Sequence, residues 1–172
     1  VLLDARRVFD LGTPHLSMYE LSLEPQPSFG HAENHRHLVQ GDEELVTLMY
    51  QEIVALNEAQ GRRQYEVSCA ALPGFESQHN LGYWQGRPYL GLGAGAHGFF
   101  PQGTGAIRFG NTPSEAEYLD TITGTLTWAD LPSEEIRVSE TEYFEDLMMT
   151  GLRLREGVLP NAKMKLRYRK QV

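Results

Sequence analysis

The sequence QHNLGYWQGRPYLGLGAGAHG, residues 78–98, combines two histidines, three large aromatic residues and six glycines. No other segment of the chain joins imidazole groups to so permissive a backbone. Glycine lets a ligand or a second backbone approach closely, and imidazole supplies a nitrogen that can bind a metal or a proton. We therefore expect any small ligand of this protein to bind within this stretch.

Two elements are predicted inside the stretch, a short helical turn at 79–84 and a strand at 89–96. Strand alternation would place Gly93, Gly95 and His97 on one face, and a face without side chains leaves room for a ligand. The segment 93–98 also fits the nucleotide-binding pattern G-x-G-x-x-G. That pattern requires a helix to begin there, but FFP follows, so a dinucleotide site is not favoured.

The predicted helical turn carries a candidate ligand site. His79, Tyr83 and Trp84 stand at positions i, i+4 and i+5. This spacing suggests an imidazole beside two aromatic faces, which suits an axial ligand with flat apolar walls for a macrocycle. The alternative is a helix-capping histidine with ordinary core aromatics, and the spacing alone favours that alternative.

Outside this stretch, apolar spacing and capping residues predict helices at 2–11, 43–60, 113–123 and 140–156. Asp42 is the expected N-cap of the second helix, and Thr112 and Ser139 open the capping boxes of the last two. The second helix is expected to bury one stripe of apolar residues, which are Leu45, Leu48, Met49, Ile53 and Leu56.

Strands are predicted at 15–23, 65–71 and 89–96. The first has apolar residues on both faces, as a strand of a parallel sheet does. Strands alternating with helices and followed by further helices indicate the α/β fold class. Three parallel strands leave both sheet edges exposed, so the sequence predicts only part of a larger domain.

Composition narrows the function classes. The 172 residues suit one domain, or one domain and part of another, and the net charge of −8 argues against general nucleic-acid binding. The single cysteine, Cys69, excludes an internal disulfide and any cysteine-ligated zinc or iron–sulfur site built by this chain alone. No apolar run reaches the roughly 20 residues of a membrane span. Five of the fifteen basic residues lie in the last ten positions.

Two further candidate sites are weaker. His31, His35 and His37 have metal-like spacing, but no acidic or thiol partner stands at a matching distance, so a solvated loop is favoured. Cys69 lies between Ser68 and Ala70 on a predicted interior strand. Because no lysine or histidine adjoins it to lower its pKa, a buried and unreactive thiol is favoured.

Three segments together resemble a known family: HLSMYELSLEP at 15–25, YEVSCAALPG…HNLGYW…YLGLGAGAHG at 65–98, and GLRLREGV at 151–158. They look like the HemW heme-chaperone family, which is related to oxygen-independent coproporphyrinogen III oxidase within the radical SAM superfamily. The resemblance extends to about Leu159. It implies the later strands of a partial (β/α)6 radical SAM barrel over 1–105, then the start of a helical C-terminal domain over 106–172 with an unmatched basic tail.

The resemblance also implies roles for particular residues. HNxxYW is the segment linked to heme binding in these chaperones, so His79 would be the iron ligand, with Tyr83 and Trp84 packed on the porphyrin. By similarity to the oxidase branch, Ser22 and His97 would lie near S-adenosylmethionine or substrate, beside the glycine-lined strand. The cofactors implied are heme and, in the full-length family, S-adenosylmethionine and a 4Fe–4S cluster.

The chain departs from the family pattern in ways that affect function. The family holds its cluster through CxxxCxxC near the N-terminus, and neither this motif nor the early S-adenosylmethionine-binding residues occur here. The family's SNFARPG reads SCAALPG at 68–74, with Cys69, Ala70 and Leu72 as the substituted residues. The chain thus resembles the C-terminal part of such a protein, and we expect it alone not to be catalytic.

Three hypotheses follow. The first is a truncated relative or fragment of a heme chaperone that binds heme for transfer to partner proteins. The second is a fragment of a coproporphyrinogen-oxidase-like radical SAM enzyme of porphyrin biosynthesis, and the third is a partial barrel without activity. The expected partners are heme, heme-accepting proteins or the missing N-terminal half, with no nucleic acid and no membrane span. The expected compartment is the cytoplasm, or alternatively the mitochondrial matrix.

Overall fold

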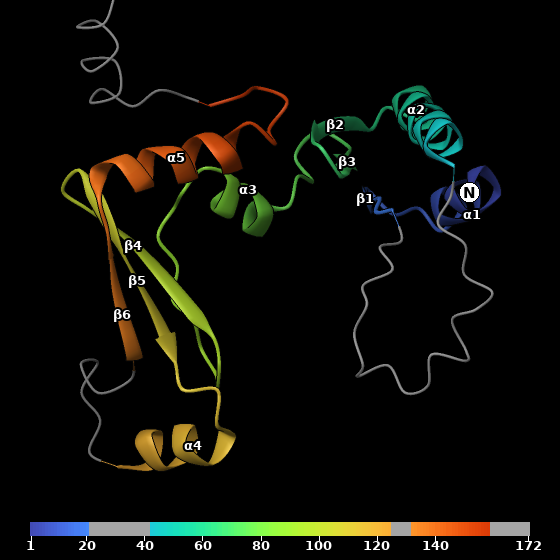
Figure 1. Ribbon diagram of the computed structural model, residues 1–172. Helices are drawn as coiled ribbons and strands as arrows, with labels where there is room; N and C mark the ends of the chain where they lie inside the picture. The colour runs from blue at the N-terminus through green and yellow to red at the C-terminus, as the bar shows by residue number, and fades with distance from the viewer. Residues whose placement is uncertain (21–41, 125–131, 159–172) are drawn as a thin grey trace, which may run out of the picture. The chain divides into compact units, whose positions relative to one another are not determined.

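A computed structural model describes residues 1–20, 42–124 and 132–158, and the chain divides into two compact units (Figure 1). The N-terminal unit is Val1–Glu76, and the C-terminal unit is Ser77–Val172. The N-terminal unit contains α1 (Leu2–Asp10), β1 (His15–Ser17), α2 (Glu43–Ala59), β2 (Arg63–Glu66) and β3 (Cys69–Ala71). The C-terminal unit contains α3 (Gln78–Trp84), β4 (His97–Gln102), β5 (Gly105–Asn111), α4 (Glu115–Thr123), β6 (Pro132–Val138) and α5 (Glu140–Gly151).

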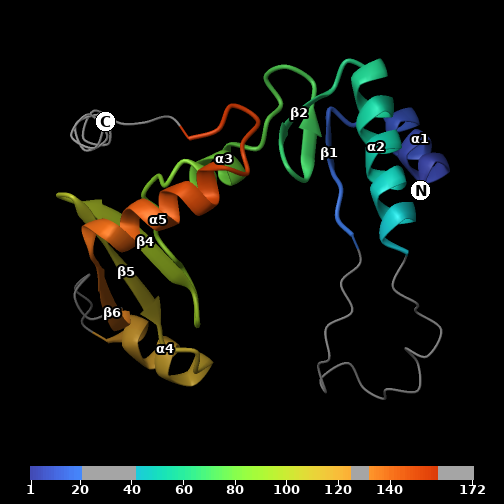
Figure 2. The ribbon, with the colours of Figure 1, turned by 45° about the horizontal axis from the view of Figure 1, so that its top comes forward.

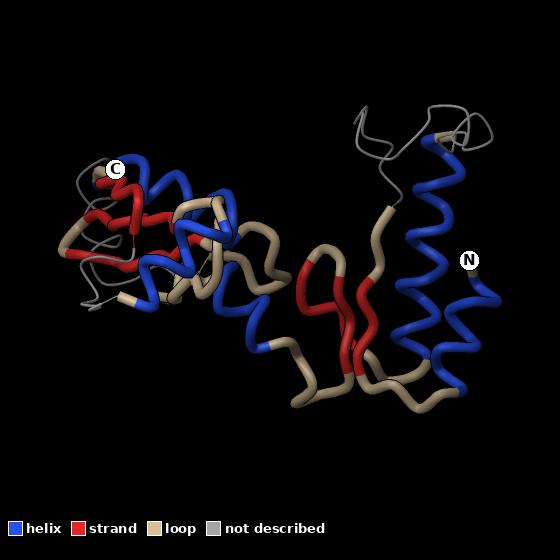
Figure 3. Tube along the Cα trace, turned by 90° about the horizontal axis from the view of Figure 1, so that it is seen from below, coloured by secondary structure: helices blue, strands red, loops and turns tan. Residues whose placement is uncertain are grey.

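The sheet of the N-terminal unit has the strand order β1–β3–β2, and both pairings are antiparallel (Figure 3). The predicted parallel sheet is therefore wrong for the described strands. The predicted strand 65–71 is two strands, because the chain reverses at Val67 and Ser68. The Val67 carbonyl accepts hydrogen bonds from Tyr50 Oη and from Gln64 Nε2, both at 2.9 Å, and these side chains stabilise the reversal.

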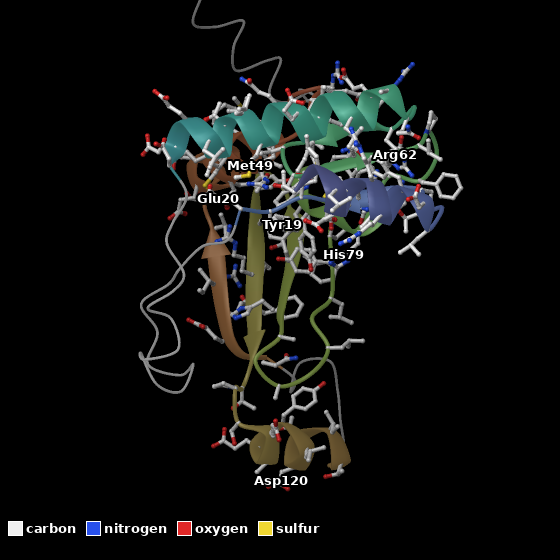
Figure 4. All side chains as sticks on the ribbon, turned by 90° about the vertical axis from the view of Figure 1, so that its right-hand side faces the viewer. Tyr19, Glu20, Met49, Arg62, His79 and Asp120 are labelled. Carbon is white, nitrogen blue, oxygen red and sulfur yellow. The ribbon has the colours of Figure 1, made fainter. Side chains whose placement is uncertain are left out.

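Both helices of this unit begin and end where the sequence predicts. The Asp42 carboxylate accepts a hydrogen bond from the Glu44 amide at 2.9 Å, which caps α2. Arg62, only 5% exposed, ties the segment after α2 to the segment after α1 (Figure 4). Its Nε donates to the Thr13 carbonyl at 3.2 Å, and its guanidinium lies 4.2 Å from the centre of the Phe9 ring.

The predicted apolar stripe of α2 is only partly covered. Met49, Ile53 and Leu56 are half-buried, whereas Leu45 and Leu48 are 51% and 53% exposed, so the prediction is wrong for these two. The buried residue of this helix is Asn57, whose Nδ2 donates to the Ile53 carbonyl at 2.9 Å. The described strands of this unit are three or four residues long, too short to cover the first turns of a 17-residue helix.

The sheet of the C-terminal unit has the order β4–β5–β6 and is also antiparallel. Its core consists of Phe99, Ala106 and Val138, with Tyr89 and Tyr143 packed against them. The helix α5 packs on β5 and lies beside α3 (Figure 2). The sequence analysis predicted neither β5 nor β6. Glycines interrupt the alternation of β5, and β6 is largely polar, so neither shows the apolar pattern on which strand prediction depends.

The predicted strand 89–96 is also wrong. Tyr89 makes a single antiparallel bridge with Phe99, and the chain then forms a loop up to the start of β4. Gly93 and Gly95 have φ angles of +110° and +68°, which residues other than glycine rarely adopt. The alternating glycines therefore serve a turning backbone and do not form the bare face of a strand.

The capping predictions fare better. The capping box of α5 is present in both halves, with Ser139 Oγ accepting from the Glu142 amide and the Glu142 carboxylate accepting from the Ser139 amide. The cap of α4 is Ser114 and not Thr112, since Ser114 Oγ accepts from the Glu117 amide at 3.3 Å. The helix α5 ends at Gly151, before the predicted Gly157.

The described strands form two separate sheets and no closed barrel. In the sequence, the first compact unit ends at Glu76 and the second begins at Ser77. The predicted family domain boundary at 105 stays a prediction. Several predictions lie outside the described residues, namely the end of strand 15–23, Ser22, the basic tail and the histidines His31, His35 and His37. None of the helices in the described ranges is both long and apolar enough to cross a bilayer.

Candidate ligand site

The helix α3 places His79 and Tyr83 on the same face. Ser77 Oγ accepts a hydrogen bond from the Asn80 amide at 3.2 Å and begins the helix, which ends before Gly86 at φ +63°. One helical turn apart, the His79 and Tyr83 rings meet edge to face, with centroids 4.7 Å apart and planes at 85°. The His79 side chain is exposed (Figure 4), and its ring makes no hydrogen bond within the described part of the chain.

A series of aromatic contacts connects this exposed imidazole to the core. The Tyr83 ring lies 4.6 Å from the Tyr89 ring, Tyr89 stacks on Phe99 at 6.0 Å, and Phe99 contacts Tyr143 at 5.9 Å. Aromatic pairs contribute about 0.5–1.5 kcal/mol each beyond the area they bury. The contacts therefore hold Tyr83, and through it the face of α3 that carries His79, against the buried sheet.

Burial favours the neutral form of two phenols in this series, Tyr89 and Tyr143. It raises the pKa of Tyr89; the neighbouring Tyr83 adds to this rise, and the Arg108 guanidinium opposes it. Burial also raises the pKa of Tyr143. Both groups thus remain protonated far above neutral pH, and they present uncharged aromatic walls.

A cleft of about 560 Å³ opens beside these rings, entirely within the C-terminal unit. Its walls come from α3, from the segment that follows it, and from the glycine-containing loop before β4. Small-molecule sites usually enclose about 300–1,000 Å³. The lining side chains with polar or aromatic character are Gln78, His79, Tyr83, Arg87, Tyr89 and His97.

Asn111, at the end of β5, fixes the loop wall of the cleft. It is 5% exposed, and its Nδ2 donates to the carbonyls of Gly91 at 3.2 Å and of Gly93 at 2.8 Å. The Gly93 amide in turn donates to Tyr118 Oη at 3.0 Å. A Cβ at Gly91 would lie 2.3 Å from the carbonyl oxygen of His97, so only glycine fits there. The wall is therefore built from backbone held by side chains of β5 and α4.

His97 enters the cleft from the first position of β4. It pairs across the sheet with Gly110, and a Cβ at Gly110 would lie 3.0 Å from the imidazole. The absence of a side chain at Gly110 thus makes room for the His97 ring.

The structure brings three of the predicted site residues, His79, Tyr83 and His97, to this one cleft. Trp84 does not line it. Five residues of α-helix rotate a side chain by about 140° from the starting face, so Trp84 points away from His79. Its ring lies 4.4 Å from the Arg153 guanidinium and borders a second cavity of about 380 Å³ beneath α5.

The remaining predicted residues have other positions. Gly93 and Gly95 belong to the loop, and their peptide groups bond to Asn111, Tyr118 and Thr112. Sequence reasoning missed Arg87, Tyr89 and Asn111 as parts of the site. Arg87 and Tyr89 lie inside the stretch 78–98, so the sequence could have indicated them. Asn111 reaches the loop only through the pairing of β4 with β5, which no local sequence pattern predicts.

Among the described residues, any metal ion would find fewer than three clustered side-chain ligands. No group of three or more His, Cys, Asp and Glu side chains in the described ranges could hold a metal ion. A heme iron requires only one or two protein ligands, because the porphyrin supplies the others. The predicted burial of Cys69 is confirmed, and burial together with a hydrogen bond to Glu66 raises the pKa of its thiol.

Comparison with known proteins gives relatives by sequence. No protein-family model matches the chain, and no solved structure matches it. The heme chaperone HemW of Escherichia coli (strain K12) is 41% identical over 102 residues, which are 58% of this chain and 26% of that protein. HemW of Lactococcus lactis subsp. lactis (strain IL1403) is 33% identical over 156 residues, 91% of this chain and 39% of that protein.

A related match comes from an animal protein. The mitochondrial radical S-adenosyl methionine domain-containing protein 1 of Danio rerio is 34% identical over 146 residues, 84% of this chain and 33% of that protein. The chain thus spans between about a quarter and two fifths of the length of these relatives. These matches confirm the predicted resemblance: over most of its length the chain is similar to a portion of HemW-type heme chaperones.

Proposed function

We propose that this chain is the heme-binding C-terminal portion of a HemW-type heme chaperone and that His79 is its iron ligand. The observation that carries the proposal is the exposed His79 imidazole, held edge to face by Tyr83 at the wall of a cleft of about 560 Å³. The bacterial relatives are named as heme chaperones, and this supports the same ligand.

The residues of the cleft fit a heme. A bound heme would supply an iron whose axial position accepts an imidazole nitrogen. The His79 ring makes no hydrogen bond within the described residues, so either of its nitrogens can bind. Tyr83 restricts the rotation of this ring, Tyr89 holds Tyr83, and both aromatic rings offer flat surfaces to a macrocycle.

Trp84 has a different part in this proposal. Since it faces α5 and stacks with Arg153, it anchors α3 to the core and does not cover the ligand. His97 lines the same cleft, and in this proposal it would contact the same ligand. For Ser22, Gly93 and Gly95 we retain the role that the family resemblance implies, which is proximity to S-adenosylmethionine or substrate in the complete protein.

The wider proposal concerns the whole protein. The chain would contribute the later strands of a radical SAM barrel and the start of the C-terminal domain, with a boundary near 105. Other parts of the protein would supply S-adenosylmethionine and the 4Fe–4S cluster, and heme would pass to heme-accepting proteins. Such a protein would work in the cytoplasm or, as the name of the Danio rerio relative says of that protein, in mitochondria.

The test is a titration of the 172-residue chain with hemin, followed by absorbance in the Soret region. We expect a shifted Soret band in the wild type and its loss in His79→Gln. The matched control is His15→Gln, which removes an imidazole outside the cleft; His15 Nε2 lies 3.0 Å from Tyr65 Oη, and an amide keeps that contact. A shifted band that survives His79→Gln unchanged would refute the assignment.

A further inference from the structure

The charges around the cleft are unevenly distributed. Among the described residues that line it, Arg87 is the one with a permanent charge, and none is acidic. The chain as a whole carries a net charge of −8. The lining of the cleft is therefore positively charged, although the whole chain is negatively charged. A positively charged lining suits an anionic group on the ligand.

Arg87 differs from the other arginines among the described residues of its unit, each of which has an interaction partner. Arg108 pairs with Asp146, Arg137 pairs with Glu135 at 3.4 Å, and Arg153 stacks on Trp84. The Arg87 guanidinium makes no ion pair and no hydrogen bond within the described part of the chain. Its backbone amide donates to the Gly82 carbonyl at 2.9 Å, so the end of α3 fixes where the side chain starts.

We propose that Arg87 binds a carboxylate of the ligand, and that the cleft thereby selects porphyrins with free propionate groups. The proposal rests on the heme function proposed above. Heme joins an iron, for which His79 is placed, to two propionates at the rim of the macrocycle. A guanidinium binds a carboxylate through two parallel N–H···O bonds, a geometry that fits an arginine at the edge of a cleft.

The size of the effect follows from exposure. Arg87 is exposed, so water and salt screen its charge, and exposed ion pairs contribute at most about 1 kcal/mol. A loss of that size corresponds to a roughly threefold to fivefold larger dissociation constant. The difference in hemin affinity between wild type and a variant without the Arg87 charge should decrease at high ionic strength, because the Debye length falls from about 10 Å at 0.1 M to about 3 Å at 1 M salt.

The experiment compares two ligands, hemin and hemin dimethyl ester, in the same detergent-containing buffer. The ester keeps the iron and the macrocycle but has no free carboxylate. We expect Arg87→Gln to bind hemin roughly threefold to fivefold more weakly than wild type and to bind the ester equally well. Arg87→Lys should recover part of the hemin affinity. The control is Arg137→Gln, which removes the same charge from β6, outside the cleft.

The outcomes separate the two proposals. If wild type and Arg87→Gln bind hemin equally, in a manner that still depends on His79, the carboxylate role is refuted and the heme function stands. An equal loss for hemin and its ester also overturns the role, because it would mean that Arg87 acts through structure alone. If the wild type binds neither ligand, the heme function itself fails.

Discussion

Replacing Asn111 by aspartate should detach the glycine-containing loop from the sheet. The substitution keeps the size of the side chain but removes both N–H donors, which serve the carbonyls of Gly91 and Gly93. Each lost hydrogen bond costs about 1 kcal/mol, and a buried carboxylate facing two carbonyls adds a desolvation cost. We expect a loss of about 2–4 kcal/mol in the free energy of unfolding of the C-terminal unit.

The assay is urea unfolding followed by tryptophan fluorescence, because both tryptophans of the chain, Trp84 and Trp128, belong to the C-terminal unit. Hydrogen exchange at the amide of residue 111 adds a local measure. This backbone amide donates to the Ala96 carbonyl, so its protection should persist after the substitution of the side chain. The control is Gln102→Glu, the same exchange of amide for carboxylate at an exposed end of β4. A loss below about 0.5 kcal/mol, which is usual for a surface substitution, would refute the reasoning.

Two further predictions concern the loop and the last helix. Gly91→Ala should abolish the hemin-induced Soret shift and lower the unfolding midpoint, since its Cβ would meet the His97 carbonyl oxygen at 2.3 Å; an unchanged spectrum and midpoint would contradict the fit of the loop. Hydrogen bonds from Ser139 lower the pKa of the Glu142 carboxyl below its ordinary value of 4.5. The stabilisation of the folded state by these bonds is therefore complete above pH 4.5 and is lost as the pH falls through the lower pKa of the folded state. Ser139→Ala should therefore differ from wild type in urea midpoint more at pH 7 than at about pH 3, and a constant difference would count against this coupling.

The helices were predictable because their signals are local. A capping residue, an apolar period and a terminal glycine lie within one segment, and they located α1, α2, α3 and α4 to within two residues, together with the start of α5. The same local geometry brought His79 and Tyr83 together one turn apart. Helix geometry also excludes Trp84 from the site, because a residue five positions after His79 points to a different side of the helix.

The sheets were not predictable in the same way. The reversal at Val67 depends on side chains of α2 and β2, and the loop at Gly93 depends on Asn111 and Tyr118 from later elements. Alternating residues in 65–71 and 89–96 matched a strand pattern, but the pattern does not reveal where long-range hydrogen bonds bend the chain. The family resemblance identified the ligand candidate without fixing the geometry of its walls.

Tyr83 and Tyr89 border both the cleft and the second cavity beneath α5. On this side the walls of both spaces contain tyrosine side chains, whereas at Gly91 the backbone of the loop lies against the backbone of His97. The wall at Gly91 therefore has no adjacent space into which it could move, whereas the wall at the two tyrosines has such a space behind it. A macrocycle wider than the cleft would displace these two tyrosines toward the cavity of about 380 Å³ beneath α5. That cavity therefore provides the space into which the site can expand.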